Sequence, residues 1–231
     1  MIAPDMRNPV ERAAAFLDDC DTLMLDMDGT LLDLAFDNYM WRERIPAEYA
    51  RARGLPRERA RAELYEKYQS VLGTLNWYCL DHWSDLLGID VLGLHRELQH
   101  RVRFLPGARE FLAEASRRDL RLLLVSNSHP ATLAVKAEAT GLAGYFDGIY
   151  LSHEVGYAKE EQAFWHTLAD SETFELSRAV FVDDTERVLT AAREYGLTRL
   201  LAITRPDTTA PARPCGDFRG IEGVAELLAP G

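Results

Sequence analysis

Five short apolar runs, spaced along the chain, constrain the fold more than any other feature. Most of them are followed at once by polar residues and then by apolar residues at helical spacing. Strands that alternate with helices in this way form a parallel sheet with helices on both faces. The sequence therefore predicts an α/β fold with a Rossmann-like parallel sheet. The expected strands are 22–25, 121–125, 148–151, 179–182 and 200–203.

Helix signals follow several of these runs. Pro130 stands where a first helical turn would begin, and Gly141 stands where that helix would end. Gly196 stops another helix in the same way. Helices are expected at 108–118, from Pro130 to Gly141, at 186–195 and, as a short final helix, at 221–228, with a surface loop at 205–219.

The stretch between the first two predicted strands is far longer than one crossover needs. It shows no strand-like alternation, and its apolar residues, such as Leu64, Tyr68 and Leu72, recur with a helical period. We therefore expect a helical insert at 34–103, which sits above a core made of 1–33 and 104–231.

Composition and charge exclude several classes of protein. The 231 residues are 47% hydrophobic and 27% charged, which is ordinary for a globular protein. No run approaches the roughly 20 apolar residues that span a bilayer, and residues 1–10 lack the apolar run of a secretory signal. The net charge of −11 offers no basic face for a nucleic-acid backbone. The sequence predicts a cytoplasmic protein with neither a membrane nor a nucleic acid as partner.

The cysteines and histidines show no spacing typical of a metal site. Cys20, Cys79 and Cys215 lie far apart, and they fit free thiols in a reducing compartment better than a disulfide framework or a zinc site. The same absence of ligand spacing holds for His82, His95, His100, His153 and His166.

The strongest chemical signal is the segment Asp26-Met27-Asp28-Gly29-Thr30, directly after the first apolar run. Carboxylates at the carboxyl end of a buried parallel strand face the crevice in which open α/β sheets bind ligands. Taken alone, the segment also fits a simple Asp-Gly turn after a strand.

Three further polar signals follow later strands. Ser126 and Asn127 follow the second strand, Lys159 comes eight residues after the third, and Asp183-Asp184 follow the fourth. Each has an ordinary explanation as a helix cap, a solvated lysine or a turn. Together they predict one crevice that holds four carboxylates, a hydroxyl and an ammonium group.

These four segments resemble the motifs of the haloacid dehalogenase superfamily over the whole chain. One departure is Glu160, which follows Lys159 where many members carry proline. The resemblance implies that Asp26 attacks a phosphoryl group and that Asp28 acts as acid and base. It favours phosphoryl chemistry, because dehalogenating members lack an acid at the position of Asp28.

A phosphate dianion repels an attacking carboxylate, so the reaction calls for a divalent cation such as Mg²⁺. The expected ligands are the carboxylates of Asp26, Asp183 and Asp184 and the backbone carbonyl of Asp28. At least one of Asp183 and Asp184 is expected to bind the metal directly, and direct binding by both is the weaker expectation. Lys159 and Ser126 would steady the phosphoryl oxygens. We expect Thr30 to hydrogen-bond Asp28 or a neighbouring loop.

In this superfamily a helical insert after the first motif is a cap that selects the leaving group. Two aromatic stretches of the insert, 32–41 and 74–83, and segments near Ser126 and Lys159 resemble the bacterial GMP/IMP 5′-nucleotidase subgroup. This resemblance implies a purine nucleoside monophosphate as substrate. The residues expected to bind substrate are Asn127, Thr30, Asn38, Asn76, Trp77 and Tyr78.

The ordinary interpretation remains open for several of these residues. Aromatic residues of the insert can simply pack its helices. His129 and Lys136 fit groups that support the site or lie beside the phosphate, but a helix-start role for His129 and a solvated side chain for Lys136 are the more common cases. Three other functions also remain: a phosphatase of the same fold for phosphoglycolate or a sugar phosphate, a phosphomutase, and a binding protein on an inactive phosphatase scaffold.

Overall fold

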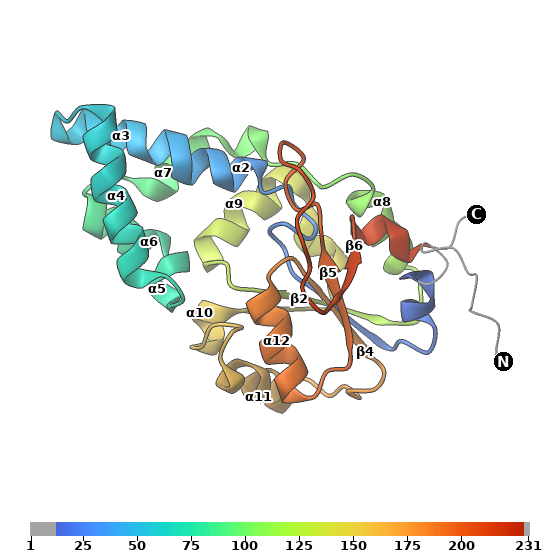
Figure 1. The fold of residues 1–231 in the computed structure, drawn as a ribbon. Helices are drawn as coiled ribbons and strands as arrows, with labels where there is room; N and C mark the ends of the chain where they lie inside the picture. The colour runs from blue at the N-terminus through green and yellow to red at the C-terminus, as the bar shows by residue number, and fades with distance from the viewer. Residues whose placement is uncertain (1–12, 229–231) are drawn as a thin grey trace.

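The computed structural model describes residues 13–228, and its centre is a six-stranded parallel sheet (Figure 1). The strand order is β3-β2-β1-β4-β5-β6, and every neighbouring pair is parallel. The predicted fold class is confirmed, and five of the strands match the predicted runs to within one residue at either end. The strands are β1 (Thr22–Leu25), β2 (Arg121–Ser126), β3 (Gly148–Leu151), β4 (Ala179–Asp183), β5 (Arg199–Ile203) and β6 (Arg219–Ile221).

Strand β1 lies inside the sheet, between β2 and β4, and its side chains reach the hydrophobic clusters on both faces. Leu23 and Leu25 belong to one hydrophobic cluster, and Met24, between them, belongs to the other. Side chains along a strand alternate between faces, so a run of apolar residues fits only a strand buried on both sides. Phe111 of α8 (Ala108–Ala115) packs in the first cluster, whereas Phe164 of α11 (Gln162–Ser171) packs in the second.

The helices of the core follow the predicted starts and stops in most places. Gly141 and Gly196 end α9 and α12 with positive φ angles of 73° and 118°. Helix α8 ends three residues before the predicted limit, and α11 was not predicted. The core elements are η1 (Ala15–Leu17), α8 (Ala108–Ala115), α9 (Pro130–Thr140), η4 (Leu142–Tyr145), α10 (Ser152–Val155), α11 (Gln162–Ser171), α12 (Glu186–Tyr195) and η5 (Val224–Leu227).

The predicted helix at 221–228 is wrong. Ile221 belongs to β6, where it pairs with Ile203 and is 2% exposed, and only the short 3₁₀ turn η5 follows. Gly220 and Gly223 flank Ile221, and glycine disfavours an α-helix by about 1 kcal/mol relative to alanine. A buried β-branched residue between glycines therefore extends the sheet.

Between β1 and β2 the chain forms a group of helices beside the sheet, in agreement with the expected helical insert (Figure 1). The first three elements run together as one long helix, which contains a π-helical segment at Met40–Arg44 and ends at Gly54. The elements are α2 (Ala35–Tyr39), η2 (Met40–Arg44), α3 (Ile45–Arg53), α4 (Arg57–Val71), α5 (Leu75–Tyr78), α6 (Leu80–Leu87), α7 (Val91–Glu97) and η3 (Gln99–Arg101).

The chain leaves the core and returns to it at adjacent points. Leu32 and Phe104 form an antiparallel bridge, and Asp33 N donates a hydrogen bond to Arg103 O at 2.9 Å. Two adjacent, antiparallel crossings would allow a helical unit to move as a cap, and we propose 34–103 as that cap. Within the described part of the chain, none of the helices is both long and apolar enough to traverse a bilayer.

Candidate active site

The carboxyl ends of three neighbouring strands bring four predicted residues to one edge of the sheet. Asp26 follows β1 directly, Ser126 ends β2, and Asp183 ends β4 with Asp184 next. The strand order changes sides of β1 after β3, so β1 and β4 flank a topological switch point. Open α/β sheets bind their ligands at such a point.

Lys159 connects these strand ends. Its ammonium group donates hydrogen bonds to Asp26 Oδ1 at 2.6 Å, Asp183 Oδ2 at 2.7 Å and Val125 O at 3.0 Å. Its backbone N donates to the amide oxygen of Asn127 at 2.9 Å. The side chain is only 2% exposed, so the lysine is fixed inside the site and is not the solvated residue that its type would suggest.

Burial determines the charges at this edge. It raises the pKa of Asp26, an effect that Lys159 opposes and Asp183 reinforces. Burial and the nearby Asp26 raise the pKa of Asp184 to about 6. Burial alone would lower the pKa of Lys159, but Asp183 and Asp26 outweigh it and keep the pKa above its ordinary value. The carboxylates thus crowd together with less positive charge than would balance them, a condition that a bound cation relieves.

The donor atoms fit a hard divalent cation. One carboxylate oxygen from each of Asp26, Asp183 and Asp184 lies within 4.8 Å of the others. Oxygen donors of this kind suit Mg²⁺. Gly29 has a φ of +88°, and a Cβ there would meet Asp184 Oδ2 at 2.5 Å, so only glycine lets the loop that carries Asp28 approach this closely.

Asp28 belongs to an ion-pair network that the sequence did not predict. Lys136 Nζ donates to Asp28 Oδ1 at 2.6 Å and to both carboxylate oxygens of Asp37 at 2.8 Å. Lys136 is 1% exposed, which overturns the expectation of a solvated lysine. Its place beside Val135 and Thr132 on the buried face of α9 is the signal that could have found it. Burial raises the pKa of Asp28, although Lys136 opposes this.

A cavity of about 540 Å³ joins the strand edge to the helical insert. It is of the size that small-molecule ligands occupy. Its lining contains most of the predicted site residues: Asp26, Asp28, Asn38, Trp77, Tyr78, Ser126, Asn127, Lys159, Asp183 and Asp184. Other lining residues were not assigned to the site from sequence, among them Asp37, Trp41, Arg42, Tyr68, His95, Thr132 and Arg213.

Two predicted residues lie outside the cavity lining. Asn76 is exposed on α5, one residue before the lining residue Trp77. Thr30 is fully buried, and its hydroxyl has no hydrogen-bond partner among residues 13–228. The hydrogen bond expected between Thr30 and Asp28 or a neighbouring loop is therefore absent among the described residues, and Thr30 is buried without one beside the buried Leu31.

Glu160 connects the insert to the core. Its carboxylate accepts hydrogen bonds from Tyr78 OH at 3.2 Å and from Asn127 Nδ2 at 2.9 Å. Tyr78 comes from the insert, and Asn127 from the end of β2. The residue that departs from the family pattern thus ties together two lining residues, one from the insert and one from the core.

The wall opposite the strand edge is aromatic. Trp41, Tyr68, Trp77 and Trp83 meet in edge-to-face contacts with ring centroids 5.2 to 6.2 Å apart. Trp83 is completely buried, whereas the others are partly exposed. Trp41 and Arg42 lie in the π-helical segment, and such segments often mark functional sites. The same four rings therefore pack the helices of the insert against one another and line the cavity.

Together, the fold and the site, with a carboxylate cluster at the strand ends and a buried lysine between them, are those of a hydrolase with a parallel-sheet core. The chain belongs to the haloacid dehalogenase-like hydrolase family, whose model matches residues 20–196. It is thus an enzyme of the phosphatase type, as the carboxylate at Asp28 predicts.

The chain is similar to two curated relatives and to a solved structure. It is 40% identical over 190 residues to GMP/IMP nucleotidase YrfG of Escherichia coli (strain K12), which covers 82% of this chain and 86% of the relative. It is 27% identical over 184 residues to pyrimidine 5′-nucleotidase YjjG of the same organism, covering 71% and 77%. A HAD phosphatase from Thermococcus onnurineus matches with a TM-score of 0.74 and 20% identity, covering 90% and 95%, and shares the fold.

Proposed function

We propose that this enzyme hydrolyses purine nucleoside 5′-monophosphates, GMP and IMP foremost, to nucleoside and phosphate with the help of Mg²⁺. One observation carries the proposal: a single cavity has the carboxylate and lysine cluster at one end and an aromatic wall at the other. The first suits a phosphoryl group and the second suits a base. The 40% identity to a GMP/IMP nucleotidase supports the same substrate class.

The reaction begins at Asp26. Its carboxylate oxygen forms a bond to phosphorus while the bond from phosphorus to the 5′-oxygen of the nucleoside breaks. Asp28 gives its proton to the departing oxygen and later takes a proton from the water that attacks the aspartyl-phosphate. The second step releases inorganic phosphate and restores Asp26. Lys159 and the Ser126 hydroxyl hold the phosphoryl oxygens during both steps.

Hydrolases of this family generally use Mg²⁺. Asp26, Asp183 and Asp184 would hold the ion, with the Asp28 carbonyl as a further ligand. When bound, it neutralises the charge that otherwise keeps the carboxylate and the phosphate apart. Arg213, which donates to Asp184 O at 2.6 Å, keeps the loop after β4 in position.

Asp28 is suited to its task by its surroundings. Its raised pKa makes the protonated form accessible near neutral pH, and Lys136 fixes the direction of the carboxylate. Because Asp37 shares the same lysine and belongs to the insert, the acid and the proposed cap are joined through one ammonium group.

The purine preference is assigned to the lining residues of the insert. Arg42 offers a fork of donors that matches the O6 and N7 acceptors of a 6-oxopurine, whereas adenine has a donor in place of O6. Asn38 is held by a hydrogen bond from its Nδ2 to Asp207 at 2.7 Å, so its oxygen is the group free to accept from the base. Trp77 and Tyr78 supply flat surfaces beside them.

The substrate and the compartment are consistent with each other. A small phosphate ester needs no basic surface on the protein, and the net charge is −11. Cys20, Cys79 and Cys215 are free thiols, as a reducing compartment requires. We propose the cytoplasm as the place of the reaction.

The decisive experiment is phosphate release from a panel of GMP, IMP, AMP, CMP, UMP, phosphoglycolate and hexose phosphates, with Mg²⁺ and with excess EDTA. Phosphate release should be faster from the nucleotides than from the other esters. Activity should be lost in excess EDTA and restored when Mg²⁺ is added back. Faster release from phosphoglycolate or hexose phosphates would replace the nucleotidase with a sugar-phosphate type of phosphatase. Sugar phosphate isomers without free phosphate would indicate a phosphomutase, and full activity in EDTA would refute the metal requirement.

A further inference from the structure

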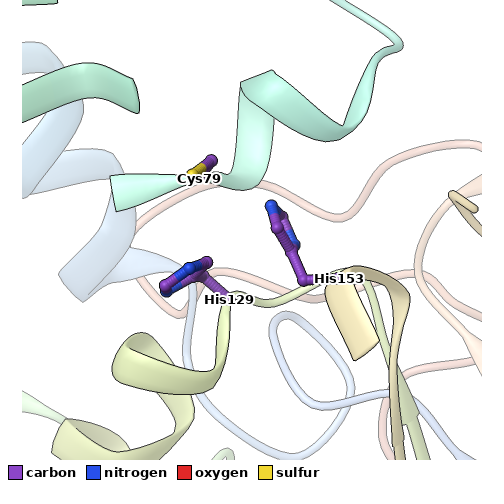
Figure 2. Close-up of side chains that lie close together, drawn as sticks. All are labelled: Cys79, His129 and His153. Atoms are coloured by element: carbon purple, nitrogen blue, oxygen red, sulfur yellow. The ribbon is translucent and has the colours of Figure 1, made fainter. Parts of the chain in front are cut away.

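Three soft donor groups from distant parts of the sequence meet beside the active site. Donor atoms of Cys79, His129 and His153 all lie within 4.8 Å of one another (Figure 2). Cys79 stands between α5 and α6 of the insert, His129 at the start of α9, and His153 on α10. All three are partly exposed, so an ion can reach them from solvent.

Two of the donors are available as ligands. Nδ1 of His153 is buried and has no hydrogen-bond partner within the described part of the chain. Burial and the neighbouring His129 ring lower the pKa of His153, while a backbone hydrogen bond with Leu75 and the charge of Asp81 oppose this. Among residues 13–228, the Cys79 sulfur accepts one hydrogen bond, from His82 N at 3.4 Å.

His129 adds a third donor. The exposed carboxylate of Asp81 lies next to His129 but outside the group of three donors, so its side chain would have to turn toward an ion to add a fourth. The Nε2 atom of His129 lies 3.8 Å from Asp81 Oδ2, on the first turn of α6. The Nδ1 atom of His129 accepts a hydrogen bond of 3.2 Å from Ala131 N, which caps α9. Ligation through this ring exchanges that long hydrogen bond for a bond to an ion.

We propose that Cys79, His129 and His153 form a binding site for a soft divalent cation of the zinc type, with Asp81 as fourth ligand. One thiolate, two imidazoles and a carboxylate are the donors that zinc takes in tetrahedral sites. This set differs in kind from the all-oxygen cluster at Asp26, so Mg²⁺ and zinc choose different sites.

Zinc would join the insert to the core. Bonds of about 2.0 to 2.3 Å put tetrahedral ligands about 3.5 Å apart, so donors separated by up to 4.8 Å must draw together. Cys79 and Asp81 belong to the insert and the two histidines to the core. Tyr78, next to Cys79, lines the catalytic cavity. An ion here therefore restrains the opening of the cavity.

The first test is binding of the metal alone. Full-length enzyme, stripped with chelator and returned to excess Mg²⁺, is titrated with Zn²⁺ and, for its thiolate charge-transfer absorption, with Co²⁺. Two variants remove a donor but keep a helix cap: in Cys79→Ser the hydroxyl still accepts from His82 N, and in His129→Asn the amide oxygen still accepts from Ala131 N. Cys215→Ser is the control, because Cys215 lies outside the cluster.

We expect one equivalent of Zn²⁺ bound by the wild type and by Cys215→Ser, with binding at least about tenfold weaker in both cluster variants. The cobalt band should disappear in Cys79→Ser. Equal binding by the wild type and Cys79→Ser, or no binding by correctly folded wild type, would overturn the site and leave the two histidines as an edge-to-face ring pair.

The second test is the coupling to turnover. With Mg²⁺ in excess, Zn²⁺ should slow phosphate release by the wild type and by Cys215→Ser, while Cys79→Ser keeps its rate. Equal inhibition of all three would mean that zinc acts at the catalytic carboxylates, and it would overturn the restraint on cavity opening.

Discussion

The two ends of the catalytic cavity are built in different ways. At the strand edge, Lys159 forms three hydrogen bonds of 2.6 to 3.0 Å to groups that three neighbouring strands position. At the opposite end, rings from the insert meet at centroid distances of 5.2 to 6.2 Å. The hydrogen bonds of this ring cluster, from Tyr68 OH to Trp41 O at 3.1 Å and from Trp83 Nε1 to Trp77 O at 2.9 Å, stay within the insert. Hydrogen-bonded backbone therefore fixes the groups for the chemistry, and side-chain packing shapes the surface for the leaving group.

This difference separates two kinds of mutational effect. A change at the strand edge should lower the rate for every phosphate ester, since each uses the same phosphoryl site. A change in the wall of the insert should alter the ratio between substrates, because it acts only on the part of the ester that varies. The predictions below test this division, beginning with the largest effect.

Asp26→Asn should reduce turnover of every substrate by at least about 10³-fold, because the amide cannot attack phosphorus. The fold should remain, since the change removes one negative charge from a crowded cluster whose carboxyl pKa values are raised. Single-turnover phosphate release and thermal unfolding measure the two parts. Substantial hydrolysis in a pure preparation would contradict a covalent mechanism at Asp26.

Asp28→Asn should lower the rate with IMP by about 10²-fold or more, because the lost group protonates the departing oxygen. The loss with p-nitrophenyl phosphate should be much smaller, since its leaving group needs no proton. The amide oxygen can still accept from Lys136, so the ion-pair network is only weakened. An equal loss with both substrates would assign Asp28 to the dephosphorylation step or to a structural role.

In the wall of the insert, Arg42→Gln and Asn38→Ala should each change the ratio of kcat/KM for IMP to that for AMP by about tenfold. Asn76→Ala is the matched control, because Asn76 is exposed and lies outside the cavity lining. The p-nitrophenyl phosphate rate should stay close to wild type in all three. If Asn76→Ala changes the IMP-to-AMP ratio, or if neither Arg42→Gln nor Asn38→Ala changes it, this assignment of the base-reading residues is refuted.

Local patterns explain why the strand edge could be predicted from sequence. An apolar run followed by Asp26 or by Asp183 is enough to place a carboxylate at the carboxyl end of a buried strand. The same reasoning found Ser126 and Lys159, which the structure brings to this edge. Strand β6 was missed because its three residues, with Gly220 in the middle, are too few to carry a periodic signal.

The contacts of the insert could not be predicted, because they depend on tertiary packing. Nothing near Lys136 in the sequence indicates that Asp28 and Asp37 will surround it. Asn76 and Trp77 are neighbours in sequence, yet only the second lines the cavity, since the exact rotation of a short helix decides which side chain faces inward. Helical periodicity identifies an insert but not the face it turns to the substrate.

The smallest effect on turnover is expected at His95, whose contribution is to the stability of the insert. It is 1% exposed, its Nδ1 bonds to Val91 O at 2.8 Å, and burial lowers its pKa from 6.5 to about 4. Lys136 contributes to this lowering of the pKa, whereas the Val91 carbonyl and Asp28 oppose it. Between pH 6.5 and 4 the unfolded chain therefore binds a proton that the folded chain does not.

The free energy of unfolding should accordingly fall as pH decreases through this range, by at most about 1.4 kcal/mol per pH unit from this one group. The raised pKa values of the buried carboxylates act in the opposite sense, so the comparison must be between wild type and His95→Asn, whose amide keeps the donor to Val91 O. Urea unfolding at pH 7, 6 and 5 should show that the free energy of unfolding falls less steeply with decreasing pH in His95→Asn than in the wild type. His166→Asn, on the exposed face of α11, should leave the slope unchanged. Identical slopes for wild type and His95→Asn would mean that the buried ring accepts a proton in the folded enzyme, and the helical end of the cavity would then be as open to water as the strand edge.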